Sequence, residues 1–282
     1  MVQSKLFSVN KTLQVQGKII DLNSPKVMGI LNVTPDSFYD GGRYIEGSTF
    51  LKQAEKMIRE GADFIDVGGY SSRPGAVDIP EDEELARVIP VIQAIKKEFP
   101  TVILSIDTFR SKIAIAAVNE GAAVVNDISG GQLDPKMFDA VAALQVPYIA
   151  MHMRGTPQTM NQLTQYENLV KEMLDYFHHK IHTLIAAGVK DVIIDPGFGF
   201  AKTVAQNFEL LKNLNQLHIL ERPLLVGLSR KSMIWRTLEI TPEDSLNGSS
   251  VLNSIALLKG ASILRVHDVK EAREVITLMS KL

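Results

Sequence analysis

Short apolar runs recur along the chain, and each ends at a polar or charged residue. The runs are as short as strands and show no polar alternation, as expected for parallel strands buried on both faces. Eight of them, separated by helical stretches, cover 27–31, 64–65, 102–104, 123–125, 148–150, 192–194, 224–226 and 263–264. This pattern predicts an α/β fold of the (β/α)8 TIM-barrel type, in which the carboxyl ends of all strands face one site.

An open, doubly wound sheet would give the same alternation of strands and helices, and it is the alternative fold. Its Gly-x-Gly-x-x-Gly fingerprint does not follow the first strand here. Four helical patterns end on a glycine directly before an apolar run, which suits the left-handed conformation after a helix. These glycines are Gly61, Gly121, Gly188 and Gly260. Their repeated context supports the barrel.

Ahead of the first barrel strand, small apolar segments predict a β-hairpin. Leu13, Val15, Gly17 and Ile19 alternate with polar residues, the period expected of a strand with one covered face. We expect this hairpin to close the bottom of the barrel. Because a barrel of about 250 residues with extensions is one domain, residues 1–282 are predicted to form a single domain.

Composition narrows the class of protein. The chain has 282 residues, of which 45% are hydrophobic, a formal net charge of −2 and no cysteine. The balanced charge argues against a nucleic-acid partner, and the lack of thiols excludes cysteine nucleophiles and cysteine-bound zinc. The first ten residues contain no signal-peptide core, and no apolar run approaches membrane-spanning length. The expectation is therefore a cytoplasmic protein without a membrane partner.

Three strand ends carry hydrogen-bond acceptors. Asp107, Asn126 and Asp195 follow the third, fourth and sixth apolar runs, and Asn126 can also donate. Such a set suits a flat heterocycle rich in N–H donors. The alternative is that arginine or lysine side chains inside the barrel already pair these carboxylates, because buried charges require partners.

Cations follow the last two strands. Lys231 comes after the seventh run, and Arg265 and His267 come after the eighth, where barrels of this type frequently bind phosphate. Arg73, in a turn-rich loop at 68–76, could reach the same place. Each cation alone could be a solvated surface charge, but their convergence favours an anion site. Lys231 could instead donate to a carbonyl of the heterocycle.

Two loops at the predicted mouth, 32–42 and 68–76, are rich in glycine and proline. They are either solvent-exposed connections or lids over the site, and their place at the catalytic face favours lids. His178, His179 and His182 lie in one helical segment. A metal pair there is the alternative to surface histidines, but no third ligand lies near in sequence.

Several catalytic signatures are missing. The sequence has no Gly-x-Ser-x-Gly elbow, no His-x-His at the first strand end and no lysine at the sixth. These absences argue against a serine hydrolase, an amidohydrolase-type metalloenzyme and a Schiff-base aldolase. An acceptor-lined pocket beside an anion pocket suits a transfer in which phosphate or pyrophosphate leaves.

Seven ordered motifs resemble dihydropteroate synthase, across nearly the whole chain. They are LNVTPDSF at 31–38, SSRPG at 71–75, NDI at 126–128, MHM at 151–153, DPGFGF at 195–200, SRK at 229–231 and RVHDV at 265–269. The family's second loop often reads Ser-Thr-Arg, whereas this chain has Ser72 before Arg73. A hydroxyl remains, so only contacts to the second substrate could differ slightly.

The resemblance implies condensation of 6-hydroxymethyl-7,8-dihydropterin pyrophosphate with p-aminobenzoate, giving 7,8-dihydropteroate and pyrophosphate for folate synthesis. It also implies Mg²⁺ as cofactor, a homodimer and sensitivity to sulfonamides.

By the same resemblance, the pterin is held by Asp107, Asn126, Met151, Asp195, Phe200 and Lys231, with Gly227 also among the substrate-binding residues. Asn32 contacts the magnesium pyrophosphate, and Arg73, Arg265 and His267 bind its oxygens. The p-aminobenzoate site would comprise Ser72, Arg73, Pro74, Lys231 and Ser232. The catalytic set is Asp107, Asp195, Lys231, Arg265 and His267.

The family is expected to react by a dissociative path, in which pyrophosphate leaves before the aryl amine attacks. Two other functions remain open. The pterin-binding barrels of corrinoid methyltransferases share the aspartate and asparagine positions but have no reason to keep the Ser-Arg-Lys and Arg-Val-His elements. A catalytically silent paralogue that binds pterin or a partner protein is the second alternative.

Overall fold

The computed structural model describes residues 9–33, 39–40, 43–44, 49–71 and 78–282. Eight parallel strands form its centre, in the order β10-β9-β8-β7-β6-β3-β12-β11. A parallel bridge between Ile194 and Leu224 closes the ring between β10 and β11. The strands are β3 (Lys26–Asn32), β6 (Phe64–Gly68), β7 (Ile103–Asp107), β8 (Ala122–Asp127), β9 (Tyr148–Met151), β10 (Val192–Asp195), β11 (Leu225–Val226) and β12 (Ile263–Val266). The predicted (β/α)8 barrel is confirmed, and the open sheet is excluded.

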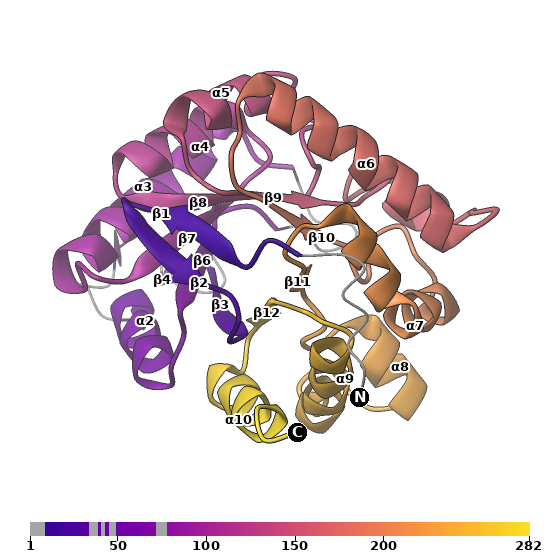
Figure 1. Ribbon diagram of the computed structural model, residues 1–282. Helices are drawn as coiled ribbons and strands as arrows, with labels where there is room; N and C mark the ends of the chain where they lie inside the picture. Colours follow the sequence, from indigo (N-terminus) through magenta and orange to yellow (C-terminus); the bar gives the residue numbers. More distant parts are fainter. Residues whose placement is uncertain (1–8, 34–38, 41–42, 45–48, 72–77) are drawn as a thin grey trace.

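Helices surround the barrel on the outside (Figure 1). The α-helices are α2 (Thr49–Arg59), α3 (Glu81–Glu98), α4 (Ser111–Asn119), α5 (Met137–Leu144), α6 (Leu169–Ala187), α7 (Val204–Lys212), α8 (Ser232–Leu238), α9 (Leu246–Leu258) and α10 (Val269–Met279). Two 3-10 helices, η1 (Met160–Gln162) and η2 (Leu214–Leu220), lie in the connections. A short antiparallel ladder joins β4 (Tyr39–Asp40) to β5 (Arg43–Tyr44).

The glycines between helices and strands adopt the predicted left-handed conformation. Gly61, Gly121, Gly188 and Gly260 have φ values of 95°, 112°, 98° and 90°. A residue with a Cβ is strained there, so glycine lets the chain turn directly from helix into strand. In the strands, small residues permit close packing: a Cβ on Gly29 would lie 2.9 Å from the sulfur of Met57 on α2.

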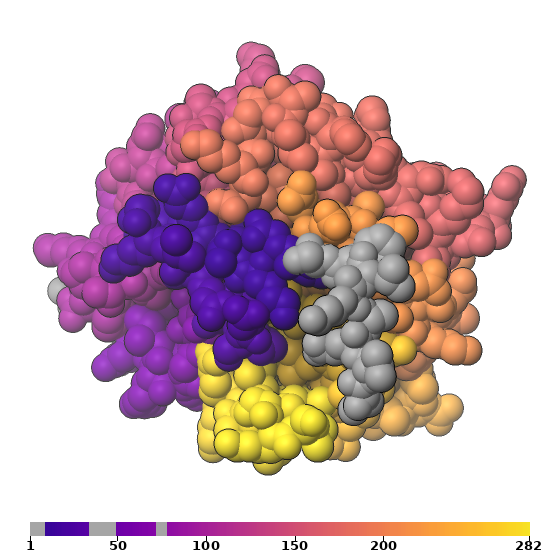
Figure 2. Space-filling model, in the orientation of Figure 1, coloured from indigo at the N-terminus to yellow at the C-terminus, as the bar shows by residue number. Residues whose placement is uncertain are grey.

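The N-terminal hairpin is formed by β1 (Thr12–Val15) and β2 (Lys18–Asp21). Leu13 and Val15 are buried in a cluster with Met28 and Phe64 of the barrel strands. In Figures 1 and 2 the hairpin, in indigo, lies across one end of the barrel. The prediction that it closes the barrel bottom is confirmed.

One detail of the hairpin differs from the predicted alternation. Ile19, expected on the covered face, is 76% exposed. The two-residue turn at Gln16 and Gly17 pairs Gln14 with Ile19 and Leu13 with Ile20. Cross-strand partners share a face, so Ile20, rather than Ile19, lies on the side of Leu13.

The largest hydrophobic cluster lies between the strands and the helices, and includes the buried side chains of Ala54 and Met57 on α2. A separate small cluster lies at the other end of the barrel from the hairpin and includes Met151 and Phe200. No helix in the described part of the chain is long and apolar enough to cross a membrane.

Candidate active site

The mouth of the barrel holds a network of charged and polar side chains from four strands. The Arg265 Nε donates a hydrogen bond of 2.7 Å to Asp66 Oδ2, and its Nη2 donates one of 2.6 Å to Asp107 Oδ2. The Asn126 amide nitrogen donates to the same Asp66 oxygen at 2.8 Å. One guanidinium thus joins β6 and β7 to β12, while Asn126 attaches β8.

This geometry decides one alternative left open by the sequence. Asp107 is already paired inside the barrel by an arginine, and that arginine is one of the residues expected to bind an anion. Burial alone would lower the pKa of Arg265, but Asp66 and Asp107 raise it above its usual value. Arg265 is therefore a permanent cation at the mouth, shared between carboxylates rather than held free.

Asp66 lies at the centre of this network but was not among the predicted site residues. It is fully buried, and its Oδ1 has no hydrogen-bond partner among the described residues. The available signal for a site role was its position near the end of β6, two residues before the last residue of that strand. The next strand along the chain, β7, ends at Asp107. The sequence marked Asp66 as polar at a strand end, but nothing in it indicated the contact with Arg265, 199 residues away.

The two predicted pterin-contacting aspartates have raised pKa values. Burial raises the pKa of Asp107 to about 7, against the opposing effect of Arg265. Burial also raises the pKa of Asp195, while the Gly197 N–H and Lys231 act in the opposite direction. Asp195 Oδ1 accepts the Gly197 N–H at 2.8 Å, so at least one of its lone pairs is oriented by its own loop.

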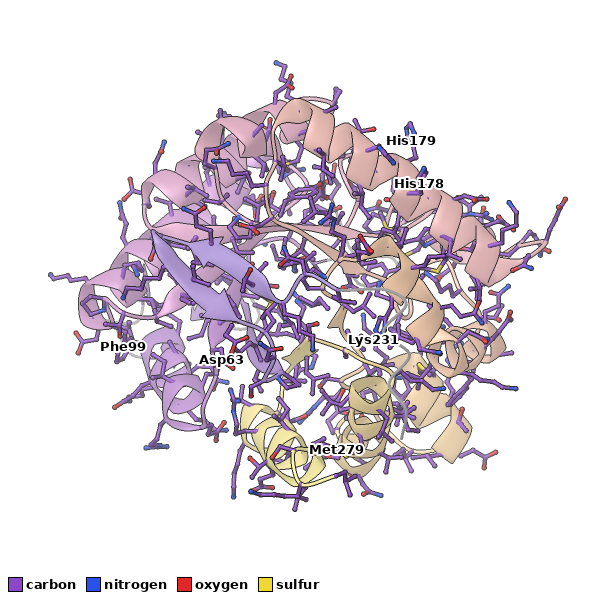
Figure 3. All side chains as sticks on the ribbon, in the orientation of Figure 1. Asp63, Phe99, His178, His179, Lys231 and Met279 are labelled. Atoms are coloured by element: carbon purple, nitrogen blue, oxygen red, sulfur yellow. The ribbon has the colours of Figure 1, made fainter. Side chains whose placement is uncertain are left out.

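Lys231 lies beside Phe200 at the mouth and is labelled in Figure 3. Its Nζ is 4.4 Å from the centroid of the Phe200 ring, a cation–π distance. Burial, followed by repulsion from Arg265, lowers the pKa of Lys231 to about 8. These contacts place an ammonium group and an aromatic face together at the mouth.

His267 is held by Ser229, the residue that ends the seventh strand region. The Ser229 hydroxyl oxygen accepts the His267 backbone N–H at 3.2 Å and lies 3.1 Å from the His267 Nδ1. Burial, then Arg265, lowers the pKa of His267 to about 4. The imidazole is therefore neutral at pH 7, and if the serine hydroxyl donates to Nδ1, the ring proton is on Nε2 and available to an anion.

The remaining predicted residues fall into two groups. Asn32 ends β3, Met151 ends β9 in the cluster with Phe200, Gly227 follows β11, and Ser232 begins α8. All four belong to the carboxyl ends of strands or the loops that follow them. Ser72, Arg73 and Pro74 lie outside the described residues, as does most of the loop at 34–42.

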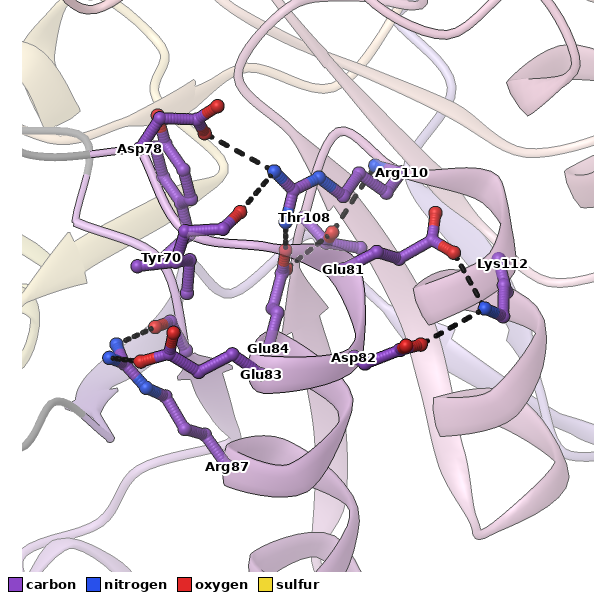
Figure 4. A network of polar contacts seen from close by, with 12 residues as sticks. Tyr70, Asp78, Glu81, Asp82, Glu83, Glu84, Arg87, Thr108, Arg110 and Lys112 are labelled. Carbon is purple, nitrogen blue, oxygen red and sulfur yellow. Dashed lines mark hydrogen bonds and ion pairs between the residues drawn. The ribbon is translucent and has the colours of Figure 1, made fainter.

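The flanks of the second loop are held by a polar network around Arg110 (Figure 4). The Arg110 guanidinium donates to Glu84 Oε2 at 2.7 Å and to the Ile79 carbonyl at 2.7 Å. It also lies 5.5 Å from the Tyr70 ring centroid. Arg110, three residues after Asp107, therefore contacts residues on both sides of segment 72–77.

The helix histidines lie on the surface of α6. His178, His179 and His182 are exposed on α6, and Figure 3 shows the first two on its outer side. The rings of His178 and His182 are 4.4 Å apart. No group of three or more histidine, cysteine, aspartate or glutamate side chains in the described ranges could hold a metal ion.

Comparison with known proteins identifies this arrangement. A family model described as pterin binding enzyme matches residues 28–267. Dihydropteroate synthase of Escherichia coli (strain K12) is 43% identical over 269 residues, covering 95% of each chain. The Bacillus subtilis enzyme of the same name is 42% identical over 258 residues, covering 91% of this chain and 88% of the relative.

This chain belongs to the dihydropteroate synthase family. The predicted function, a transferase of folate biosynthesis, is thereby confirmed.

Solved structures of the family agree with the fold. A Yersinia pestis dihydropteroate synthase crystallised in a sulfonamide drug complex superposes with a TM-score of 0.89 at 42% identity, covering 96% of this chain and 98% of that one. A Xanthomonas albilineans dihydropteroate synthase with 4-aminobenzoic acid also has a TM-score of 0.89, at 40% identity and 96% and 97% coverage.

Proposed function

We propose that this chain joins 6-hydroxymethyl-7,8-dihydropterin pyrophosphate to p-aminobenzoate, with release of pyrophosphate. The observation that carries the proposal is the barrel mouth itself, where buried carboxylates lie beside Arg265 and Lys231 in a chain of this family. A pterin edge supplies N–H donors to the acceptors, and a leaving pyrophosphate needs cations. Both requirements meet at the carboxyl ends of the same strands.

The pterin is assigned to the side of the mouth formed by β7, β8 and β10. Asp107, Asn126 and Asp195 provide acceptors there. Behind them lies the Oδ1 of Asp66, which has no partner within the described part of the chain. Met151 and Phe200 supply apolar surface for the flat rings, and Lys231 donates to a ring acceptor. A buried carboxylate oxygen that accepts no hydrogen bond is costly, so the Asp66 Oδ1 supports a ligand rich in N–H groups at this position.

The pyrophosphate is assigned to the side formed by β3, β11 and β12. Arg265 retains N–H donors beyond those used for Asp66 and Asp107, and neutral His267 offers its Nε2–H. The magnesium that the family implies would be held by Asn32. A hard cation prefers oxygen ligands and, when it binds a phosphate substrate, needs only one or two from the protein, which fits an amide oxygen at a strand end. Bound there, the ion would neutralise charge on the leaving group.

The reaction that we infer is dissociative. The bond between the pterin methylene carbon and the pyrophosphate oxygen breaks, and its electron pair leaves with the pyrophosphate. Asp107 and Asp195 stabilise the positive charge on the pterin, and Arg265 stabilises the negative charge of the leaving group. The p-aminobenzoate nitrogen then attacks and loses a proton to solvent. An aryl amine is unprotonated at neutral pH, so the site needs no strong base.

Several further expectations belong to the proposal. Ser72, Arg73, Pro74, Lys231 and Ser232 would bind p-aminobenzoate, and Gly227 would lie against the substrates. We further infer one domain over residues 1–282, a homodimer, a cytoplasmic location and inhibition by sulfonamides, each from family membership.

The test is to incubate the protein with both substrates and Mg²⁺ and to identify the product by mass. Formation of 7,8-dihydropteroate is the expected result. Methyl transfer from methyltetrahydrofolate, assayed in parallel, would instead indicate a corrinoid-type methyltransferase. Pterin binding without any product would indicate a silent binding protein.

A further inference from the structure

One buried cation at the mouth has no role in the proposed reaction. Lys202 lies between β10 and α7 and is only 8% exposed. Its Nζ lies 3.0 Å from the Gly197 carbonyl oxygen, 3.0 Å from the Phe200 carbonyl oxygen and 3.1 Å from His152 Nδ1. An ammonium group has three N–H donors. All three are matched to buried acceptors, which makes burial of the lysine tolerable. Burial lowers the pKa of Lys202 to about 7, against the opposing effect of Asp195.

The third acceptor requires a neutral histidine. His152 is 3% exposed, and its ring lies 4.8 Å from that of Tyr176 in an edge-on contact. Burial, followed by the charge of Lys202, lowers the pKa of His152 well below its usual value. With the ammonium hydrogen on Nδ1, the ring proton of His152 must be on Nε2. The histidine and the lysine therefore form one hydrogen-bonded unit across β9 and the β10–α7 loop.

The backbone between Gly197 and Phe200 is folded around this ammonium. Gly197, Gly199 and Ala201 have positive φ values of 69°, 82° and 49°. Positive φ is uncommon for a residue with a Cβ, as at Ala201, and is kept only where the surroundings impose it. Here the two carbonyl groups turn inward to the same nitrogen. The Gly199 N–H is fixed separately by Asn207 Oδ1 at 2.7 Å.

This loop carries two of the proposed pterin contacts. The Gly197 N–H holds the Asp195 carboxylate, and the Phe200 ring lies against the Lys231 ammonium. Lys202 thus donates to the carbonyl oxygens of Gly197 and Phe200. The N–H of Gly197 orients Asp195, and the ring of Phe200 faces Lys231.

We propose that Lys202 is a positioning residue for the pterin pocket: its ammonium organises the loop backbone and so sets Asp195 and Phe200 in place. The inference rests on the proposed pterin site. Lys202 does not touch the substrate in this scheme, because its three donors are already used. Its effect on binding passes through the backbone and through the position of the Asp195 carboxylate.

The test compares wild-type protein with Lys202→Met, which keeps the length of the side chain and removes its charge and donors. The ligand is 6-hydroxymethyl-7,8-dihydropterin, which lacks the leaving group and cannot turn over, and the dissociation constant is measured by calorimetry. We expect the dissociation constant to rise tenfold or more. The KM for p-aminobenzoate at saturating dihydropterin pyrophosphate should change less than twofold.

A matched control is Lys180→Met. Lys180 is a partly buried lysine on α6, with its Nζ 5.4 Å from the Phe138 ring centroid and 5.6 Å from that of Tyr176. Within the described residues, no hydrogen bond or ion pair joins it to the pterin loop. It should lower thermal stability without changing the pterin dissociation constant. If Lys202→Met is also destabilised but binds the pterin as tightly as wild type, the positioning role is wrong and Lys202 is structural only.

A second pair of variants covers the case in which Lys202→Met does not fold. His152→Leu removes the third acceptor and leaves one ammonium hydrogen buried and unpaired, whereas His152→Gln can supply an oxygen in its place. The dissociation constant should rise several-fold in the first and return toward the wild-type value in the second. Equal affinity in both variants would overturn the proposal. Failure of wild type itself to bind the pterin would instead contradict the proposed function.

Discussion

At the scale of single residues, the mouth of this barrel is organised before any ligand arrives. The Arg265 guanidinium donates hydrogen bonds to two carboxylates, and the Asn126 amide nitrogen donates to Asp66. Its amide oxygen is left to accept from a substrate. Preorganised charges of this kind need little rearrangement as charge develops in the reaction, which is the main source of electrostatic catalysis.

The first residue-scale prediction concerns Asp195→Asn. Asparagine keeps an oxygen for the Gly197 N–H, so the loop and the fold should be retained, but the negative charge facing the pterin is lost. A hydrogen bond to a charged group is worth roughly 1.5–3 kcal/mol. We therefore expect the pterin dissociation constant to rise by about 10- to 100-fold with an unchanged circular dichroism spectrum. Wild-type affinity by calorimetry would refute the role of Asp195.

The second prediction is a pH dependence that originates at Asp107. Burial raises the pKa of this carboxyl to about 7, so its ionised fraction falls as the pH is lowered through 7. A ligand that requires the carboxylate binds in proportion to that fraction, and its affinity should fall about tenfold from pH 8 to pH 6. In Asp107→Asn this component of the pH profile should disappear. A profile unchanged by the substitution would assign the titration to another group.

At the scale of elements, the network around Arg110 joins the start of α3 to the loop after β7. Glu84, on the first turn of α3, is fully buried and accepts from Thr108 at 2.7 Å and from Arg110. The Arg110 guanidinium also bonds the Ile79 carbonyl just before the helix. One side chain therefore fixes where α3 begins relative to the strand end that carries Asp107.

The prediction at this scale is that Arg110→Met destabilises the fold by about 3–5 kcal/mol, because a buried carboxylate loses its partner. The loss should be smaller at low pH, where Glu84 becomes neutral by taking up a proton. Chemical denaturation at two pH values measures both effects. Lys112→Met, which removes exposed ion pairs to Glu81 and Asp82, is the control and should leave the unfolding midpoint almost unchanged. Equal loss in both variants would contradict the account.

The elements were predictable because their signals are local. Short apolar runs marked every barrel strand, glycines marked the start of four of them, and polar strand ends marked most of the mouth. The pairing of Arg265 with Asp66 and the three acceptors around Lys202 were not predictable, because they depend on atoms brought together from distant segments. Ile19 was misplaced for a related reason: the turn conformation, rather than residue alternation alone, decides which face β2 presents.

At the scale of the whole molecule, the hairpin closes the end of the barrel opposite the mouth. Its side chains Leu13 and Val15 complete the cluster inside the lower barrel, while the charged network occupies the opposite end. Stability and chemistry are therefore separated along the barrel axis, as is usual for this fold.

This separation predicts that Leu13→Ala lowers stability by about 2–5 kcal/mol through the cavity it leaves. The pterin dissociation constant should stay at the wild-type value. Ile19→Ala, on the exposed side of the same hairpin, should change stability by less than about 0.5 kcal/mol. Denaturation and calorimetry on both variants check the prediction, and weaker pterin binding by folded Leu13→Ala would show that the two ends are coupled.

The measurement that tests the central claim most directly is pyrophosphate release from dihydropterin pyrophosphate and Mg²⁺, followed with and without p-aminobenzoate while the product mass is monitored. Our account predicts that p-aminobenzoate couples each pyrophosphate released to one 7,8-dihydropteroate formed, and that Asp195→Asn loses both. Release without dihydropteroate when p-aminobenzoate is present, or bound pterin with no release in either condition, would contradict the assignment of this barrel mouth as a synthase site.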